Sequence, residues 1–379
     1  MQAFTFNTAA SIIFEPGASL KLAEHCQRLQ VRRPLLVTDP GLIALGLLEP
    51  VIHALTQAGL PPLLFDQVRE DPPDSVILSA AAMARDAGAD GVIAVGGGSS
   101  MDVAKLVAVL LVGEQPLETL YGVDQVHSGR LPLVLVPTTA GTGSEVTPVA
   151  VVTTGDTTKA GVSSSVLLPD VAVLDADLTL GLPPLVTAMT GIDAMVHAIE
   201  AYTSRLRKNV MSDILAREAL VLLSSNIRTA VDEGSDRDAR SRMLLGAMLA
   251  GQAFANAPVA AVHALAYPLG GHYHIPHGLS NSLVLPAVMR FNLPRAERLY
   301  AELAAQVLGA EAGSADSLIV ALEAIIRDTG LPATLSQASV PEADLPMLAE
   351  DAMQQQRLLI NNPREVSRDD ALEIYRASY

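Results

Sequence analysis

The sequence is poor in cysteine and in aromatic residues. It contains a single cysteine, Cys26, no tryptophan, and only 3% aromatic residues in total. One cysteine cannot form an intrachain disulfide, which agrees with a reducing compartment, and we expect Cys26 to be a structural thiol. A fold held by a disulfide framework is therefore excluded.

Positive charge, long apolar runs and an N-terminal targeting pattern are also lacking. The net charge of −16 disfavours binding to nucleic acid or to anionic lipid, because both depend on Lys and Arg. No uninterrupted apolar run approaches the roughly 18–20 residues of a membrane-spanning helix. The N-terminal MQAFTFNTAASIIF has no basic flank before its apolar residues, so we expect no secretory signal, no membrane partner and a cytoplasmic location.

The length and the apolar pattern predict two domains. A chain of 379 residues exceeds what one hydrophobic core usually holds. In the first half, short apolar runs alternate with longer Ala/Leu-rich runs, which is typical of a parallel sheet with crossover helices. Strands are expected at 35–38, 63–65, 91–95 and 133–136, and helices at 41–58, at 74–87 and after the glycines at 96–98. We predict an α/β Rossmann-like nucleotide-binding domain over residues 1–183, then an all-α metal-binding and substrate domain over residues 184–379.

Glycines follow the third expected strand, in the segment GGGSSMDVAK that runs from Gly96 to Lys105. Glycines between a strand and a helix let backbone amides approach a pyrophosphate, and the helix N-terminus favours an anion. The segment is not the GxGxxG fingerprint, so a tight turn without a ligand remains open.

An acidic residue and a hydroxyl-rich loop follow two other expected strands. Asp39 could accept hydrogen bonds from ribose hydroxyls and repel a 2′-phosphate, which would favour NAD over NADP, or it could cap the next helix. The loop at 137–145, PTTAGTGSE, suits a ligand-facing edge or an ordinary turn. Lys159 could reach the same edge or lie in solvent.

Histidines cluster in the second half of the chain. Asp193 and His197 stand four residues apart in an expected helix at 184–202, so both project from one face. Four of the eight histidines fall within fifteen residues, namely His263, His272, His274 and His277. One carboxylate and three imidazoles would suit Fe(II) or Zn(II), while a surface hydrogen bond and a polar loop are the alternatives.

These motifs resemble, in order and spacing, those of the iron-containing (group III) alcohol dehydrogenases, a branch of the dehydroquinate synthase-like superfamily. The resemblance covers nearly the whole chain and includes Gly191-Ile192-Asp193-Ala194-Met195-Val196-His197, Pro276-His277-Gly278 and Asn362-Pro363-Arg364. It implies metal ligation by Asp193, His197, His263 and His277. It also implies cofactor contacts from Asp39, Gly97, Gly98, Ser99, Asp102, Thr138, Thr139, Thr142 and Lys159, and a substrate-pocket role for Phe254.

One position departs from the family pattern. Many relatives carry a further histidine four residues after the third ligand, where this chain has Tyr267. The proton relay is therefore open, with Tyr267, His272, His274 or bulk water as the carrier.

The resemblance implies a metal-dependent, NAD-linked alcohol dehydrogenase or aldehyde reductase for small primary alcohols or diols. Fe(II) is the favoured metal and Zn(II) the alternative, and a homodimer or larger homo-oligomer is expected. Three other functions are weighed: a metal-independent reductase of the maleylacetate reductase type, a lyase resembling dehydroquinate synthase that uses NAD and metal transiently, and a noncatalytic nucleotide-binding protein, which would leave the histidine cluster unexplained.

Overall fold

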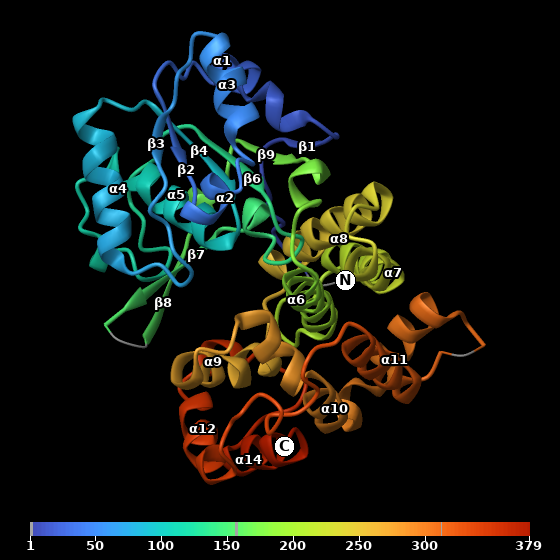
Figure 1. The fold of residues 1–379 in the computed structure, drawn as a ribbon. Coiled ribbons are helices and arrows are strands. Elements are labelled where there is room, and N and C mark those ends of the chain that lie inside the picture. Colours follow the sequence, from blue (N-terminus) through green and yellow to red (C-terminus); the bar gives the residue numbers. More distant parts are fainter. Residues whose placement is uncertain (1–2, 156–157, 312) are drawn as a thin grey trace. The chain divides into compact units, whose positions relative to one another are not determined.

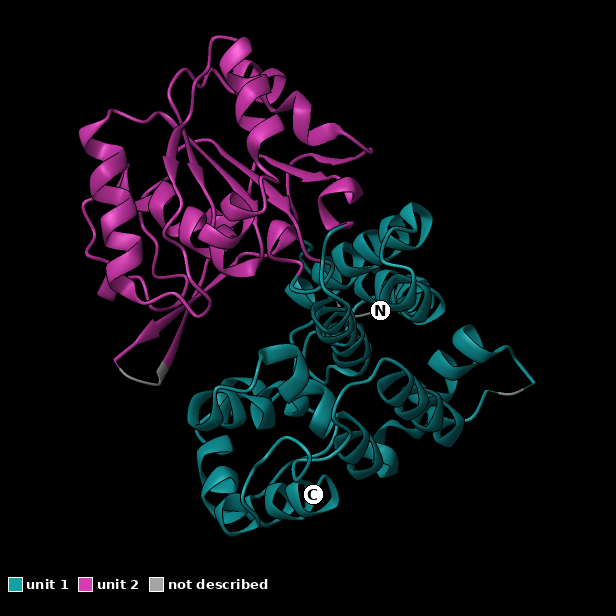
Figure 2. Ribbon diagram, viewed as in Figure 1, with its two compact units in different colours: residues 1–6, 140–142, 181–379 teal, residues 7–139, 143–180 magenta. Residues whose placement is uncertain are grey.

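A computed structural model describes residues 3–155, 158–311 and 313–379. The chain forms two compact units (Figure 2). The α/β unit consists of residues 7–139 and 143–180, and the helical unit consists of residues 1–6, 140–142 and 181–379. The main division falls between Leu180 and Gly181, while the assignment of the two short segments to the helical unit could not be read from the sequence.

A six-stranded parallel sheet forms the centre of the α/β unit (Figure 1). Its order is β1 (Ile12–Phe14), β9 (Val171–Leu174), β6 (Leu133–Pro137), β4 (Gly91–Gly96), β2 (Pro34–Val37) and β3 (Leu63–Phe65). Neighbouring strands pair in parallel throughout. The predicted α/β class is thereby confirmed, and the edge strand β1 and its neighbour β9 are additions to the predicted set.

Both faces of this sheet are buried, which explains its continuous apolar strands. Leu35 and Val37 face a core shared with α4 (Asp74–Asp86) and α5 (Gly98–Leu110). Leu36, between them, faces the opposite core with α1 (Leu22–Arg28) and α3 (Glu49–Gln57). The alternation follows from the two-residue period of a strand.

The predicted helix at 41–58 is wrong as a single element. The structure has α2 (Pro40–Ala44) and then α3. Gly46 adopts a positive φ of 68°, which ends the first helix because this conformation suits glycine. Pro50 then lies in the first turn of α3, where its missing N–H costs nothing.

A smaller sheet, absent from the sequence prediction, comprises β5 (Gly122–Val123), β8 (Thr158–Ser163) and β7 (Val149–Thr154). β7 and β8 pair antiparallel. Short 3₁₀ helices occur at η1 (Ala18–Lys21), η2 (Leu117–Thr119), η3 (Ser144–Val146), η4 (Ser165–Leu167), η5 (Ala176–Thr179) and η6 (Glu342–Asp344).

The helical unit contains no strand among its described residues, as predicted. Its helices are α6 (Pro184–Thr203), α7 (Val210–Asp232), α8 (Arg237–Asn256), α9 (Ala261–Tyr273), α10 (His277–Leu308), α11 (Ala315–Asp328), α12 (Leu345–Ala352), α13 (Gln356–Leu359) and α14 (Arg368–Ala377). In the described part of the chain no single helix is long and apolar enough to cross a membrane. The pair α8 and α9 meets that test together, bent by 106°.

Candidate metal centre and cofactor site

Three helices of the helical unit bring the four predicted metal ligands together. Asp193 and His197 lie one turn apart on α6, so their side chains leave the same face. His263 lies in the first turn of α9, and His277 is the first residue of α10. α6 packs against α10, and α10 against α9.

The ligand atoms of these side chains face one another. Oδ1 of Asp193 lies 3.9 Å from Nε2 of His197, 3.9 Å from Nε2 of His263 and 3.6 Å from Nε2 of His277. Donors about 2.0–2.2 Å from one tetrahedral ion would lie about 3.3–3.6 Å apart. The distances from Asp193 approach this spacing, and ligand atoms of Asp193, His263 and His277 all lie within 4.8 Å of one another. The donor set therefore fits a divalent transition metal.

Burial prepares these groups to act as ligands. Asp193, His197 and His263 are almost fully buried, whereas the side chain of His277 is 43% exposed. Burial lowers the pKa of His197 to about 3, so its imidazole is neutral at neutral pH and keeps a lone pair for a metal. Burial alone would raise the pKa of Asp193, but the three imidazoles and an amide lower it overall. The site is open on the side of His277.

Asn281, which the sequence analysis missed, lies among these donors. It is fully buried, and its Nδ2 donates to Oδ1 of Asp193 at 2.7 Å. The same nitrogen lies 3.2 Å from Nε2 of His277 and 3.4 Å from Nε2 of His263. Lone pairs from three ligands thus converge around one amide. Its spacing of four residues from His277 on α10 is the signal that could have identified it.

Glu200 is a second residue that sequence reasoning missed. It follows Asp193 by seven residues and His197 by three on α6, so all three share a helical face. Its Oε2 lies 2.7 Å from Nδ1 of His263. The helical period could have indicated it.

Two aromatic rings border the donor set. Phe254 stacks on His197 with ring centroids 4.2 Å apart, and the Tyr267 ring lies 5.8 Å from that of His277. Both predicted residues therefore lie beside metal ligands. His272 instead contacts the carboxylate of Asp351, and His274 ends α9 in the left-handed conformation. A proton-relay role for Tyr267, His272 or His274 remains a prediction.

The cofactor residues of the α/β unit gather where the connection order of the sheet reverses. From β2 the chain moves outward to β3 and then returns to β4 on the other side of β2. Ligands of open α/β sheets bind at the carboxyl ends of the strands at such a switch point. Asp39 follows β2 and Gly97 follows β4, so both lie at that point.

Asp39 is a helix cap in this structure. Its Oδ1 accepts a hydrogen bond from the Leu42 amide at 3.0 Å. Gly97 is the N-cap of α5, and Gly98 and Ser99 form its first turn, so their amides are at a helix start. A cap uses one carboxylate oxygen, and the ribose role of Asp39 therefore stays compatible with it.

A fully buried lysine joins α5 to the hydroxyl-rich loop. Nζ of Lys105 donates to Oγ of Ser144 at 2.7 Å and to the carbonyl oxygen of Val149 at 2.7 Å. Asp102 accepts from Oγ of Ser144 at 2.7 Å and from the Val151 amide at 2.9 Å. The motif therefore fastens the loop and β7 to α5, and a cofactor contact from Asp102 remains a prediction.

The other predicted cofactor residues are spread over this region. Thr138 is buried and its amide donates to the carbonyl oxygen of Gly96 at 3.0 Å, and Thr139 is next to it. Thr142 belongs to the segment assigned to the helical unit. Lys159, on β8, pairs with Asp71 at 2.5 Å and donates to Thr153 at 3.0 Å. Lys159 is therefore held by an acid rather than free in solvent.

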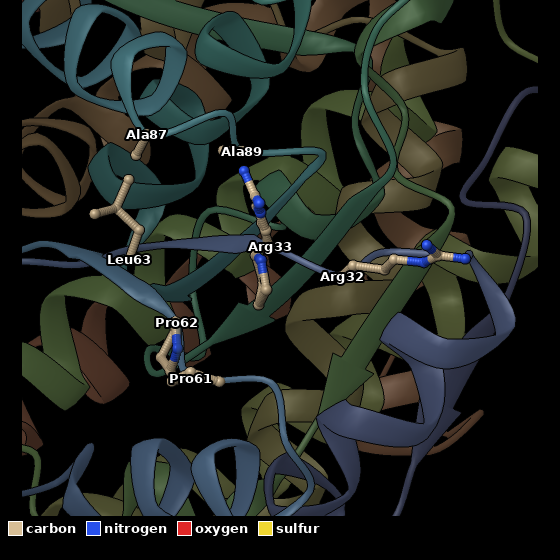
Figure 3. A pocket seen from close by; sticks show the side chains of 8 residues that line it. Arg32, Arg33, Pro61, Pro62, Leu63, Ala87 and Ala89 are labelled. Atoms are coloured by element: carbon tan, nitrogen blue, oxygen red, sulfur yellow. The ribbon is translucent and has the colours of Figure 1, made fainter.

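A pocket of about 310 Å³ lies elsewhere in the α/β unit (Figure 3). Arg32, Arg33, Pro61 and Leu63 are among its lining residues. They lie before or at the beginning of β2 and β3, at the edge opposite the glycine turn. This pocket belongs to neither the metal centre nor the predicted cofactor edge.

Two family models match the chain over most of its length. One, described as iron-containing alcohol dehydrogenase, matches residues 9–176, and the other, described as the C-terminal part of the Fe-containing alcohol dehydrogenase family, matches residues 187–379. The chain belongs to the iron-containing alcohol dehydrogenase family. The predicted family and enzyme class are thereby confirmed, and the protein is an oxidoreductase acting on alcohols.

Family members with full-length similarity carry different names. The chain is 42% identical to long-chain-alcohol dehydrogenase 1 of Geobacillus thermodenitrificans, over 98% of this chain and 97% of the other. A crystal structure of a 1,3-propanediol oxidoreductase has a TM-score of 0.95 at 35% identity and covers 100% of both chains. Sulfoacetaldehyde reductase from Bifidobacterium kashiwanohense, solved in complex with NAD+, has a TM-score of 0.90 at 27% identity over 100% of this chain and 99% of the other.

The glycine after His277 generates the first prediction. A Cβ on Gly278 would overlap the carbonyl oxygen of Met189, so α10 begins in direct contact with the backbone of α6. Gly278→Ala should push His277 away from Asp193 and weaken Zn(II) binding about tenfold or more. Chelator competition measures this. Gly270→Ala on α9 is the control, because its Cβ would meet ordinary contact distances; equal affinity in both variants would contradict the argument.

A buried glutamate generates a pH-dependent prediction. Burial raises the pKa of Glu145 to about 7, above its ordinary value of 4.5. The protonated form therefore stabilises the fold fully below pH 4.5, and this stabilisation is lost as pH rises through about 7. The stability of Glu145→Gln relative to wild type should increase by about 2 kcal/mol between pH 5.5 and 7.5. Urea unfolding measures it, with exposed Glu114→Gln as control; a pH-independent difference would refute the raised pKa.

Proposed function

We propose that this protein is a metal-dependent, NAD-linked alcohol dehydrogenase and aldehyde reductase that acts on small primary alcohols or diols. The observation that carries the proposal is the convergence of Oδ1 of Asp193 on three imidazole nitrogens at 3.6–3.9 Å. One carboxylate and three imidazoles suit a divalent metal, with Fe(II) favoured by the family and Zn(II) as the alternative.

The choice of NAD rests on the α/β unit. The glycine turn and Asp39 lie at the switch point of the sheet, where dinucleotides bind in open α/β folds. A carboxylate at the end of β2 suits ribose hydroxyls and repels the 2′-phosphate of NADP. The sulfoacetaldehyde reductase of similar fold was solved with NAD+, which supports the same cofactor here.

The side chains of this chain would perform the positioning. Asp193, His197, His263 and His277 would hold the ion, and when bound it supplies Lewis-acid polarisation of the substrate oxygen while NAD accepts the hydride. The half-exposed side of His277 leaves access for substrate. Phe254 is stacked on the imidazole of His197 and restricts the rotation of that ring. The hydroxyl of Tyr267, on α9 beside His277, is one route for the proton.

The substrate class follows from what differently named relatives share. 1,3-Propanediol and sulfoacetaldehyde, named for two of these relatives, both carry the reacting oxygen on a terminal carbon. A site that binds the oxygen through a metal needs only that feature. We therefore assign primary alcohols, diols and their aldehydes as the class.

Metal dependence is the first test of this function. Chelator-stripped protein should form no NADH from primary alcohols or diols, and Fe(II) added anaerobically or Zn(II) should restore turnover. Asp193→Ala should lower metal-restored kcat/KM by about a hundredfold or more, because a ligand is lost, whereas exposed Asp232→Ala should leave it unchanged. Full activity without metal would instead support the metal-independent reductase, and NAD binding without net NADH would support the lyase.

Cofactor choice is a separate test. Asp39→Asn retains a capping side chain but removes the charge that would repel a 2′-phosphate. The ratio of kcat/KM with NADP to that with NAD should rise about tenfold or more, an effect of roughly 1.4 kcal/mol. Steady-state kinetics with both cofactors measures it, and exposed Asp86→Asn is the control. An unchanged ratio would leave Asp39 as a helix cap alone.

A further inference from the structure

A buried carboxylate that is not a ligand lies directly behind the metal-binding face of His263. Glu200 is 3% exposed. Its Oε2 accepts from the Ala260 amide at 2.9 Å and contacts Nδ1 of His263 at 2.7 Å, and its Oε1 accepts from the Val262 amide at 2.7 Å. Every one of these partners lies at the beginning of α9.

The contact determines which nitrogen of His263 carries the proton. A carboxylate oxygen accepts hydrogen bonds, so Nδ1 donates its hydrogen to Glu200. The other nitrogen, Nε2, faces Oδ1 of Asp193 at 3.9 Å. With the proton on Nδ1, the lone pair of Nε2 is directed at the donor set, which is the tautomer that a metal ligand needs.

Glu200 also fixes the position of the backbone that carries His263. The N-cap residue of α9, Ala260, has no side chain that could cap the helix. Glu200 takes over this role from α6, because its carboxylate accepts two amides at the start of α9, where negative charge is favourable. One carboxylate thereby sets both the start of the helix and the rotation of the imidazole.

Charge balance gives an independent reason for a second carboxylate here. Asp193 and Glu200 are both buried, and within the described ranges their ion-pair partners are histidines rather than lysine or arginine. Two carboxylates without a cationic partner are costly in a protein interior. Together they match the charge of one divalent cation.

We infer that Glu200 is a positioning residue of the metal centre, which fixes the tautomer and orientation of His263 and thereby sets the affinity for the metal. The inference rests on the metal-dependent function proposed above. Glu200 acts through His263 and is not itself a ligand. Its loss should weaken the site without changing the number of ligands.

Glu200→Gln tests the inference, because the amide keeps the size of the side chain and one acceptor oxygen while removing the charge. Zn(II) affinity, measured by competition with a chromogenic chelator, should fall about 10- to 100-fold. The visible absorption of the Co(II)-loaded variant should differ from that of wild type, since the ligand field changes. Glu218→Gln, an exposed change on α7, should alter neither, and NAD affinity should be the same in all three proteins.

The outcomes separate this inference from the proposed function. Failure of the wild-type chain to bind Zn(II), Co(II) or Fe(II) would overturn both. Wild-type binding with an equal affinity and an equal Co(II) spectrum in Glu200→Gln would overturn the positioning role alone.

A second measurement covers the case in which the variant does not fold. Nitrogen-15 NMR of histidine-labelled, Zn(II)-loaded wild type should show His263 protonated at Nδ1, with its signals assigned by their loss in His263→Gln. A proton on Nε2 would overturn the inference without any change at Glu200.

Discussion

The convergence of four electron-pair donors from α6, α9 and α10 is the constraint to which the helical unit conforms. Buried carboxylate and imidazole groups are costly unless their lone pairs find partners, so each helix must be held close to the others. Gly278 meets this requirement because it has no side chain that would overlap α6. Glu200 meets it with a carboxylate at the start of α9. Gly278 allows the backbones of α10 and α6 to touch, and Glu200 fixes the start of α9, whose N-cap residue has no capping side chain.

The α/β unit solves a comparable problem without convergent ligands. Its glycine turn is the predicted phosphate site, and the adjoining loop has few apolar side chains to anchor it. Lys105 supplies the anchor, since burial within hydrogen-bond reach of Ser144 and Val149 joins helix, loop and strand. Burial lowers the pKa of Lys105 to about 8, so the carboxylate of Asp102 nearby offsets the desolvation of this amine only in part. Both units therefore place their most costly buried polar groups directly behind a ligand-binding surface.

Sequence patterns anticipated what is local and periodic. The central strands β2, β4 and β6 are continuous apolar runs, and Asp193 with His197 follows the helical period, so both could be predicted. The break at Gly46 was missed because one long helix and two shorter helices would show nearly the same apolar spacing. Only the positive φ of Gly46 distinguishes the two arrangements. β1 and β9 escaped notice although other strands of the same length were predicted. They pair with each other from opposite ends of the unit's sequence, so no local pattern indicates the pairing. Glu200 and Asn281 share helical faces with predicted ligands, but their roles depend on helices that are distant in sequence.

The predicted metal centre has a buried side and an open side. Asp193, His197 and His263 are enclosed, and any change in them would disturb the packing of three helices. His277 is the exposed member of the predicted ligand set, so under the proposed function substrate approaches from its side. Phe254 stacks on the ring of His197, and the ring of Tyr267 lies near that of His277. Under the proposed function, substitution of Phe254 or Tyr267 can change the size of the substrate site without altering the predicted donors.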